Sequence, residues 1–474
     1  MGKFKPYDRE QTYLFPLTLD EFIKDDHLAR VIDEIIEGFD TTNIEKKYSY
    51  LGQKSYHPKI LLKILFYGYS IGIRSGRKLS TECESDTAFM FLSCMQTPDF
   101  RTINDFRKDN IKEIESYFLE VLKICQNLGM IKVGELYIDS TKIRANASVK
   151  RTKDKAGYEK WLAQVEEEIK EILKEVEEID AKEDTIYGEK RGDELPKKLQ
   201  SKEVLKEKIS SLIQEMDDKK KVNLTDKDAK NIKSGGVIKP NYNCHASVTE
   251  DEIIVASKVS NNASDSGELI NVLDQAESNT QKDFNEPIAD SGYGTYDNYE
   301  ELERRGKNVY IPDQAYAKEQ KRKYKDKLNL YDKSNFIYNK DKDVFICPKG
   351  KVLIYKGKSC EDSRRYKVYK GIECSNCKVK NLCTKAKSRI IKKEEREEIR
   401  ERAITRLKTA EGQVKYNKRG YKIEPKFGHI KFNLKYFMFH LRGEEKVNGE
   451  FKLICTVSNI WKIYQFRSRL NKAA

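Results

Sequence analysis

The apolar pattern of this 474-residue chain changes near residue 131. Before that point the pattern is helical, and the dense apolar run that follows Pro58 suits a buried helix. After it, a short apolar run over 134–140 ends at Asp139, as expected of a buried strand. Further strand-like runs lie at 242–248, 253–256, 287–294 and 309–312, with helical stretches between them. We therefore expect an all-α domain over 1–130 and an α/β domain over 131–474.

Two stretches interrupt the α/β pattern. Residues 156–222 carry apolar residues at three- and four-residue steps among Glu and Lys, with a turn-prone segment at 187–196. This pattern predicts a charged helical hairpin with one apolar stripe. The hairpin is either a solvated spacer or an arm that grips DNA or another subunit. The second insertion, 330–395, holds a cluster of cysteines.

The charge balance narrows the class of partner. Lys and Arg outnumber Asp and Glu by 91 to 77, a net charge of +14. A polyanion such as nucleic acid suits this excess, although a lysine-rich solvated surface without a partner has the same balance. The sequence contains no P-loop, Rossmann fingerprint or GxSxG motif, which argues against NTPases, dinucleotide enzymes and hydrolases with a nucleophile elbow. With no membrane-length apolar run and no signal core at its start, we expect a cytoplasmic protein.

Three acidic residues are candidate metal ligands. Asp139 and Asp290 each end a strand-like run, and Glu424 begins a segment, 423–435, predicted as one helix with Pro425 in its first turn. Brought together, three carboxylates could hold two Mg²⁺ ions about 3.5–4 Å apart, with Mn²⁺ as a possible substitute. One ion would activate a water or a 3′-hydroxyl, and the other would stabilise the leaving oxygen. Alternatively, the three acids do not form one site, and each caps a helix or pairs with a lysine.

The sequence blocks around these acids carry a family resemblance. The blocks are Tyr137–Lys142, Asp290–Tyr293 and Ile423–Lys431. They resemble the three catalytic blocks of bacterial insertion-sequence DDE transposases. Further similar segments, from the helical N-terminal domain and the ribonuclease-H-like core of these enzymes, are Leu14–Pro16, Asp26–Leu28, His57–Pro58 and Gly235–Asn243. The resemblance thus covers nearly the whole chain, in order.

The resemblance implies a fold and an activity. The fold would be an α/β ribonuclease-H-like catalytic core with an all-α N-terminal DNA-binding domain, a charged helical hairpin insertion and a small four-cysteine zinc insertion. The activity would be DNA strand cleavage and strand transfer, with Asp139, Asp290 and Glu424 as catalytic metal ligands. The implied partners are double-stranded DNA, namely the terminal inverted repeats of the element and a target DNA, and a second copy of the chain, since two ends must be brought together.

The family also has a Tyr-x2-Arg-x3-Glu-x6-Lys signature around its third carboxylate. Tyr416, Arg419, Glu424 and Lys431 match it, with one extra residue between the arginine and the glutamate. The resemblance makes Tyr416, Arg419 and Lys431 candidate DNA-binding residues. If 423–435 is one α-helix, Lys431 lies two turns beyond Glu424 on the same face.

Two other functions remain open at this stage. One is a catalytically silent DNA-binding regulator derived from a transposase, although a purely binding role does not need all three acids. The other is a metal-dependent nuclease that cleaves DNA without joining it.

The cysteine cluster in the second insertion suggests a different metal. Cys347, Cys374, Cys377 and Cys383 can supply four thiolates to a tetrahedral structural Zn²⁺, and Cys360 could replace one of them. Alternatively, reduced cysteines merely lie near one another. The remaining cysteines, which are Cys83, Cys94, Cys125, Cys244 and Cys455, are expected to be small core residues.

Basic and aromatic residues alternate between 415 and 437. The basic residues could neutralise phosphates, and the aromatic residues could stack on unpaired bases at a cut DNA end. For the phenylalanines, which are Phe427, Phe432, Phe437 and Phe439, we favour a place in the core.

Overall fold

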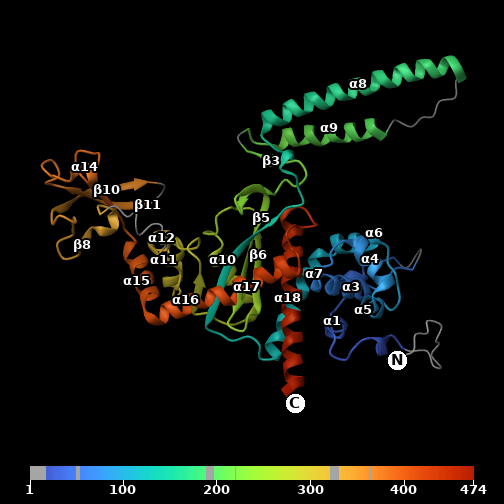
Figure 1. Ribbon diagram of the computed structural model, residues 1–474, viewed down its shortest axis with the longest axis horizontal. Coiled ribbons are helices and arrows are strands. Elements are labelled where there is room, and N and C mark those ends of the chain that lie inside the picture. Colours follow the sequence, from blue (N-terminus) through green and yellow to red (C-terminus); the bar gives the residue numbers. More distant parts are fainter. Residues whose placement is uncertain are drawn as a thin grey trace, which may run out of the picture.

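A computed structural model describes residues 18–49, 54–187, 197–218, 220–320, 330–361 and 364–473. Figure 1 shows a central sheet with a helical domain on one side, a small sheet on the other and a long helix pair above. The mixed α/β architecture with a helical N-terminal region agrees with the sequence prediction. The segment Leu14–Pro16 lies outside the described residues.

The N-terminal region is helical throughout its described part. Its elements are η1 (Leu19–Phe22), α1 (Leu28–Glu37), α2 (Thr42–Glu45), α3 (Pro58–Ser70), α4 (Gly76–Ser85), α5 (Thr87–Leu92), α6 (Phe100–Asp109) and α7 (Ile111–Asn127). Pro58 occupies the first position of α3, where a missing N–H costs nothing, and His57 caps the helix by accepting from the Lys59 N–H. Almost the whole of α3 is buried, which explains its continuous apolar run.

The central sheet contains β1 (Glu135–Arg144), β4 (Lys230–Ser234), β5 (Val237–Thr249), β6 (Ile254–Ser260) and β7 (Glu286–Ala289). β5 pairs antiparallel with β1, and on its other side with β4 and β6. β1 pairs in parallel with β7, and a parallel bridge joins Ile288 to Tyr310. The strand predicted at 309–312 is therefore reduced to a single bridge. Along the path β6–β5–β1–β7–Tyr310, only β5 runs antiparallel to the others.

Helices cover the sheet and join it to the N-terminal region. They are α10 (Leu269–Thr280), α11 (Tyr296–Arg304), α15 (Glu397–Lys408), α16 (Ala410–Lys422), α17 (Glu424–Gly428) and α18 (Glu444–Ala473). α18 lies between the sheet and the helical domain, packing on β6, α7 and α3 (Figure 1). Trp461 of α18 donates from Nε1 to the Ser70 carbonyl of α3 at 2.7 Å. One continuous hydrophobic core consequently runs through both regions.

The helix predicted over 423–435 is not a single α-helix. α17 ends at Gly428, and a π-helical turn, η4 (His429–Asn433), follows it, with the Leu434 N–H donating to the His429 carbonyl at 3.0 Å. Ile430 and Leu434 are both buried across this wider turn. Because the rotation per residue changes there, two α-helical turns do not separate Glu424 from Lys431, and the shared face that depended on this spacing stays a prediction.

Residues 152–223 form a unit with a core of its own. The helices α8 (Lys155–Tyr187) and α9 (Lys197–Glu215) pack together, and β2 (Thr152–Lys153) pairs with β3 (Val222–Asn223) beside them. The buried residues that cluster between the helices are Tyr158, Val165, Ile209, Leu212 and Met216. The predicted connection at 188–196 lies outside the described residues.

The cysteine-containing segment folds as a small antiparallel sheet, which the sequence did not predict. Its strands are β8 (Ile337–Asn339), β9 (Val344–Ile346), β10 (Val352–Glu361), β11 (Arg364–Gly371) and β12 (Ile390–Glu394), and each pairs with the next. Short helical elements accompany it: α12 (Gln314–Gln320), η3 (Lys333–Asn335) and α14 (Lys380–Cys383). Its core consists of Phe336, Phe345, Leu353, Tyr369 and Ile391.

Candidate active site

The two aspartates lie on neighbouring parallel strands. Ile138 of β1 pairs with Ala289, the last residue of β7, so Asp139 and Asp290 follow at the next position. Each carboxylate accepts a backbone hydrogen bond at 2.8 Å, Asp139 from Ser140 and Asp290 from Gly292. The parallel register therefore brings together two acids that are far apart in the sequence.

Arg419 brings the third acid to the same place. From α16, its Nη1 contacts Asp139 Oδ2 at 2.8 Å and its Nη2 contacts Glu424 Oε1 at 2.8 Å. Its guanidinium also lies 5.9 Å from the ring centre of Tyr416. The predicted DNA-binding residues Arg419 and Tyr416 thus stand among the carboxylates, and Arg419 is their counterion.

Burial makes this acidic cluster electrostatically costly. The pKa of Asp139 is raised to about 6, chiefly by burial, with Asp290 and Glu424 adding to the effect and Arg419 opposing it. Burial also raises the pKa of Asp290, and nearby Asp265 adds to it. Buried carboxylates in this state favour a nearby cation, and oxygen donors are the ligands that Mg²⁺ prefers.

The carboxylate oxygens are suitable ligands for a divalent cation, but in the structure two of the three carboxylates pair with the guanidinium of Arg419. Among the described residues, no group of three or more His, Cys, Asp or Glu side chains is arranged as a ready metal site. The guanidinium of Arg419 lies between Asp139 and Glu424, so metal binding there requires it to move aside.

A fourth acid, Asp265, adjoins the site and was missed in the sequence. Its Oδ1 accepts hydrogen bonds from Ser140 Oγ at 2.7 Å, Asn243 Nδ2 at 2.7 Å and Lys142 Nζ at 3.1 Å. A Cβ on Gly292 would lie 3.0 Å from oxygens of both Asp265 and Asp290, so a side chain there would crowd both acids. The only sequence signal was the polar loop after β6, which has no periodicity.

Lys431 lies close enough to Lys142 for the two charges to repel, but it makes no ion pair within the described part of the chain. It is half-buried, and its pKa is lowered, chiefly by burial, with Lys142 contributing repulsion. Lys142 itself pairs with Asp265 at 3.1 Å. One of these two lysines is therefore paired with an acid beside the site, and the other, Lys431, has no carboxylate partner in the described structure.

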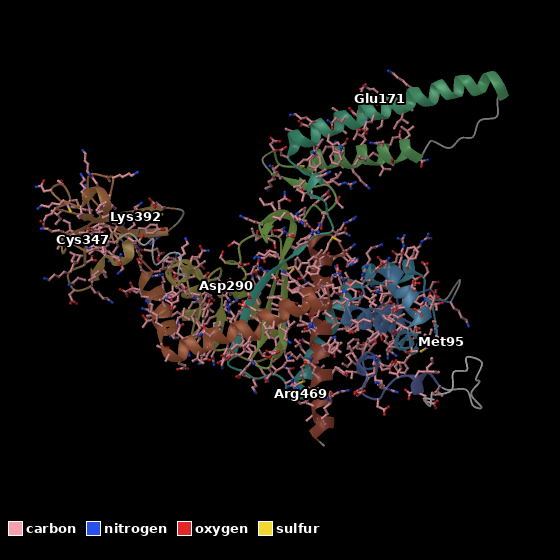
Figure 2. The ribbon with its side chains drawn as sticks, in the orientation of Figure 1. Met95, Glu171, Asp290, Cys347, Lys392 and Arg469 are labelled. Atoms are coloured by element: carbon pink, nitrogen blue, oxygen red, sulfur yellow. The ribbon has the colours of Figure 1, made fainter. Side chains whose placement is uncertain are left out.

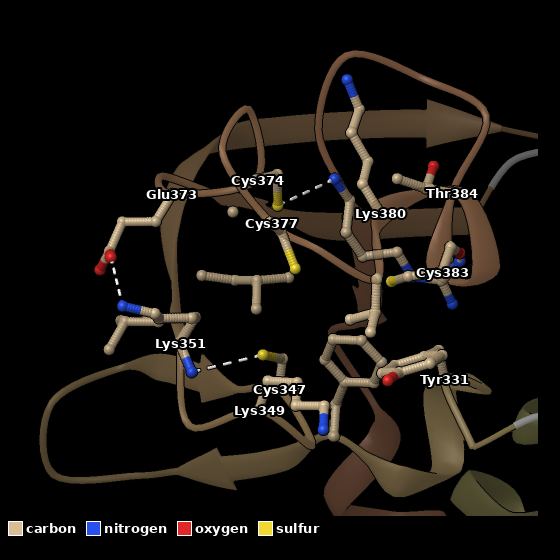
Figure 3. A pocket seen from close by; sticks show the side chains of 16 residues that line it. Tyr331, Cys347, Lys349, Lys351, Glu373, Cys374, Cys377, Lys380, Cys383 and Thr384 are labelled. Atoms are coloured by element: carbon tan, nitrogen blue, oxygen red, sulfur yellow. Dashed lines mark hydrogen bonds and ion pairs between the residues drawn. The ribbon is translucent and has the colours of Figure 1, made fainter.

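The predicted zinc ligands line one small cavity of about 30 Å³ (Figure 3). Cys347, Cys374, Cys377 and Cys383 all line it, whereas Cys360, the suggested substitute, does not. Burial raises the pKa of Cys383, and the other three thiols add to that effect. The four thiols are close enough to interact electrostatically, yet in the described structure they are not arranged as a ready metal site.

Among the other cysteines, Cys83, Cys125, Cys244 and Cys455 are buried. The prediction for Cys94 is wrong, because its side chain is exposed. It lies just after α5 with a φ of 52°, in a turn rather than in the core.

Comparison with protein families gave two matches. A family described as Transposase DDE domain matches residues 346–464, and one described as Transposase domain (DUF772) matches residues 17–109. The first match includes Glu424, Arg419 and Lys431 but begins after Asp139 and Asp290. No curated protein and no solved structure matched the chain.

Both matches are to transposase domains, and they support a transposase as the class of this protein. Together they support its identification as an insertion-sequence DDE transposase, in agreement with the resemblance noted in the sequence. In the part of the chain that the structure describes, no helix has the length and apolarity needed to cross a membrane.

Proposed function

We propose that this protein binds the ends of a mobile element, cleaves DNA strands there and transfers the cut ends to a target. The main observation that supports this proposal is that Asp139, Asp290 and Glu424 converge near the guanidinium of Arg419. The sheet supports a ribonuclease-H-like core, because its order has a single antiparallel strand, β5, beside β1. The helical N-terminal region and the net charge of +14 support DNA binding.

In this proposal the three carboxylates hold divalent metal, two Mg²⁺ ions or Mn²⁺ in their place. Bound metal would supply an activated oxygen nucleophile and stabilise the leaving oxygen. Asp139 and Asp290 are well oriented for holding it, since a backbone N–H fixes each carboxylate. Asp265 fixes Ser140 and Lys142 beside them and is a positioning residue.

The basic residues around the acids would contact the DNA backbone. Arg419, once separated from the carboxylates, is free to bind a phosphate with its two-pronged guanidinium. Lys431 lacks a carboxylate partner in the described structure, and it lies beside Lys142. Tyr416, next to Arg419, would pack against the same strand.

A plasmid-nicking assay with Mg²⁺ tests the proposal. Asp139→Ala, Asp290→Ala and Glu424→Ala should each abolish nicking and leave duplex binding nearly unchanged, because binding depends on basic residues elsewhere. Asp218→Ala, which removes an exposed acid beside α9, is the matched control and should nick like the wild type. Full cleavage by any of the three variants would remove that residue from the site.

A second assay separates the rival functions. Joining of a pre-cut end to a target plasmid is expected of a transposase. Nicking without joining would identify a nuclease, and duplex binding without nicking would identify a silent regulator.

We further propose that Cys347, Cys374, Cys377 and Cys383 hold a structural Zn²⁺, because four thiols line one cavity in a sheet with a small core. The protein would act as a homodimer, since two DNA ends must meet in one complex. The paired helices α8 and α9 remain either a spacer or an arm that grips DNA or the partner.

A further inference from the structure

Two phenylalanines that follow Glu424 along the chain are exposed. Phe432, in the π-helical turn, is 70% exposed, and Phe437, in the loop that follows, is 49% exposed. Their rings form a T-shaped pair with centres 5.8 Å apart. The core position favoured from sequence is therefore wrong for both, whereas Phe427 and Phe439 are indeed buried. An exposed aromatic pair loses burial energy unless something covers it.

The backbone that carries this pair is held from two sides. Arg74, from the N-terminal region, donates to the carbonyls of Lys435 at 2.7 Å and Met438 at 3.3 Å. Arg144, at the end of β1, donates its N–H to the Phe437 carbonyl at 3.1 Å and accepts from the Phe439 N–H at 2.9 Å. The rings stand on a fixed support, which lowers the entropy lost when a flat ligand binds.

The surroundings of the pair are basic. No acidic residue occurs in 425–443 or in 140–153, and these two stretches run side by side at the bridge between Arg144 and Met438. The Arg144 and Lys435 side chains are exposed, and neither forms an ion pair in the described structure. An apolar ring pair flanked by free positive charges matches a nucleic acid strand, whose bases stack and whose phosphates are negative.

The pair also lies close along the chain to the acids. β1 leads from Asp139 to Arg144, five residues or about 16 Å away along the strand. α17 and η4 lead from Glu424 to Phe432 on the other side. A strand whose backbone lies at the carboxylates can therefore extend toward the ring pair.

We propose that Phe432 and Phe437 form a stacking subsite for an unpaired base of the DNA strand that the enzyme processes, with Arg144 and Lys435 binding its backbone. This inference rests on the proposed function and adds to it a preference for single-stranded DNA next to a duplex. The competing occupant is a second copy of this chain.

The test compares binding of a blunt duplex with binding of the same duplex carrying a single-stranded 3′ extension. The wild-type protein should bind the extended duplex more tightly. The double variant Phe432→Ala, Phe437→Ala should lose roughly tenfold in affinity for it and keep its affinity for the blunt duplex. A 2-aminopurine base in the extension should be quenched by the wild type and not by the variant.

Matched variants sharpen the result. Tyr355→Ala removes another exposed aromatic residue, which lies on β10 and forms a T-shaped pair with Tyr369 of β11, and should change nothing. Arg144→Ala with Lys435→Ala should lower the salt-dependence slope for the extended duplex by about 1.4, or 0.7 per phosphate contact.

Two outcomes would overturn the subsite. The first is that the wild type binds the blunt and the extended duplex with equal affinity, or that the wild type and the double alanine variant bind the extended duplex with equal affinity. The other is a shift from dimer to monomer in that variant with its extension binding intact, which would assign the pair to a protein interface. Plasmid nicking by the wild type reports on the proposed function separately: nicking without a preference for extensions refutes the subsite alone.

Discussion

The carboxylate site and the cysteine cavity are built in opposite ways. Asp139, Asp290 and Glu424 come from distant parts of the chain and meet because a large continuous core fixes β1, β7 and α17. The four cysteines lie within one short segment, on a sheet with a small core of its own. Figure 2 shows the separation, with Asp290 at the centre of the molecule and Cys347 at one end.

This difference predicts which of the two regions needs its proposed metal in order to stay folded. The acids already have an internal counterion in Arg419, and their strands are held by the core whether or not a metal is bound. The small sheet has few buried side chains to offset the entropy of ordering its loops. We therefore expect metal removal to unfold the cysteine region and to leave the carboxylate region folded.

The largest expected effect is on the small sheet. Purified protein should contain about one zinc per chain, and Cys374→Ser with Cys377→Ser should lose it. Because structural zinc supplies on the order of 10 kcal/mol of folding free energy, limited proteolysis should then cut within 330–395 while the rest stays resistant. Cys360→Ser, outside the cavity, is the control. Zinc retained in the double variant, or absent from protein purified without chelators, contradicts the prediction.

The next largest effect is a change in the stability of the large core at acid pH. Burial lowers the pKa of His245 to about 4, from 6.5 in the unfolded chain. Between these values the unfolded chain binds a proton on His245 that the native state does not, so this group lowers stability by about 3 kcal/mol as pH drops from 6.5 toward 4. Asp139, whose pKa is raised to about 6, contributes in the opposite direction over much of this range. In urea unfolding of a Trp161→Phe background, followed through Trp461, the difference in stability between the parent and His245→Gln should therefore follow the His245 contribution.

All five histidines lie outside 330–395, so the His245 contribution belongs to the core and not to the small sheet. Equal slopes in the His245→Gln variant and its parent would show that another group carries the acid response.

A smaller effect concerns the loop after Asp290. A Cβ on Gly294 would lie 2.2 Å from the Pro312 carbonyl oxygen, so Gly294→Ala must shift backbone. We expect a loss of about 2 kcal/mol in core stability and weaker nicking, because Asp290 moves with the loop. Gly267→Ala, where the added Cβ meets nothing within 4 Å, should be neutral. Unchanged thermal unfolding of Gly294→Ala would mean that the loop adapts freely.

The smallest effect is within the small sheet. Tyr338→Phe removes a hydroxyl that donates to Asp343 at 2.6 Å, and should cost about 1 kcal/mol. Tyr366→Phe, whose hydroxyl makes no hydrogen bond in the described structure, should cost less. Hydrogen exchange in β8 to β12 measures both, and a response that spreads into β1 or β7 would show that the two regions are coupled.

The sequence predicted those parts of the molecule that follow simple periodicity. Apolar runs that end in Asp139 and Asp290 predicted strands, and the structure has β1 and β7 there. Asp290 follows the end of β7 as predicted, but Asp139 lies in the middle of β1, because the strand continues beyond it through mostly polar residues. The sequence did not predict the π-helical turn after Gly428, because a 3.6-residue pattern looks the same with one wider turn. The sheet over 337–394 was hidden by its many charged residues, and Asp265 by a loop without periodicity.

The pairing of Arg419 with two carboxylates was also beyond the sequence. Its spacing matched a family signature, which implied a DNA contact, whereas its partners in the folded chain depend on how α16 packs against β1 and β7. Likewise, the exposure of Phe432 depends on the wider turn and not on residue type.

Arg419 also allows the core to fold before the carboxylates bind a metal ion. The charge that the buried acids need is covalently attached to α16, so the large core can fold before a divalent ion reaches the carboxylates. In the proposed function, a divalent ion held by the acids would take the place of the guanidinium, which would then be available to a phosphate. Magnesium supply in the cell would then limit when the site reacts, and not whether the core around it folds.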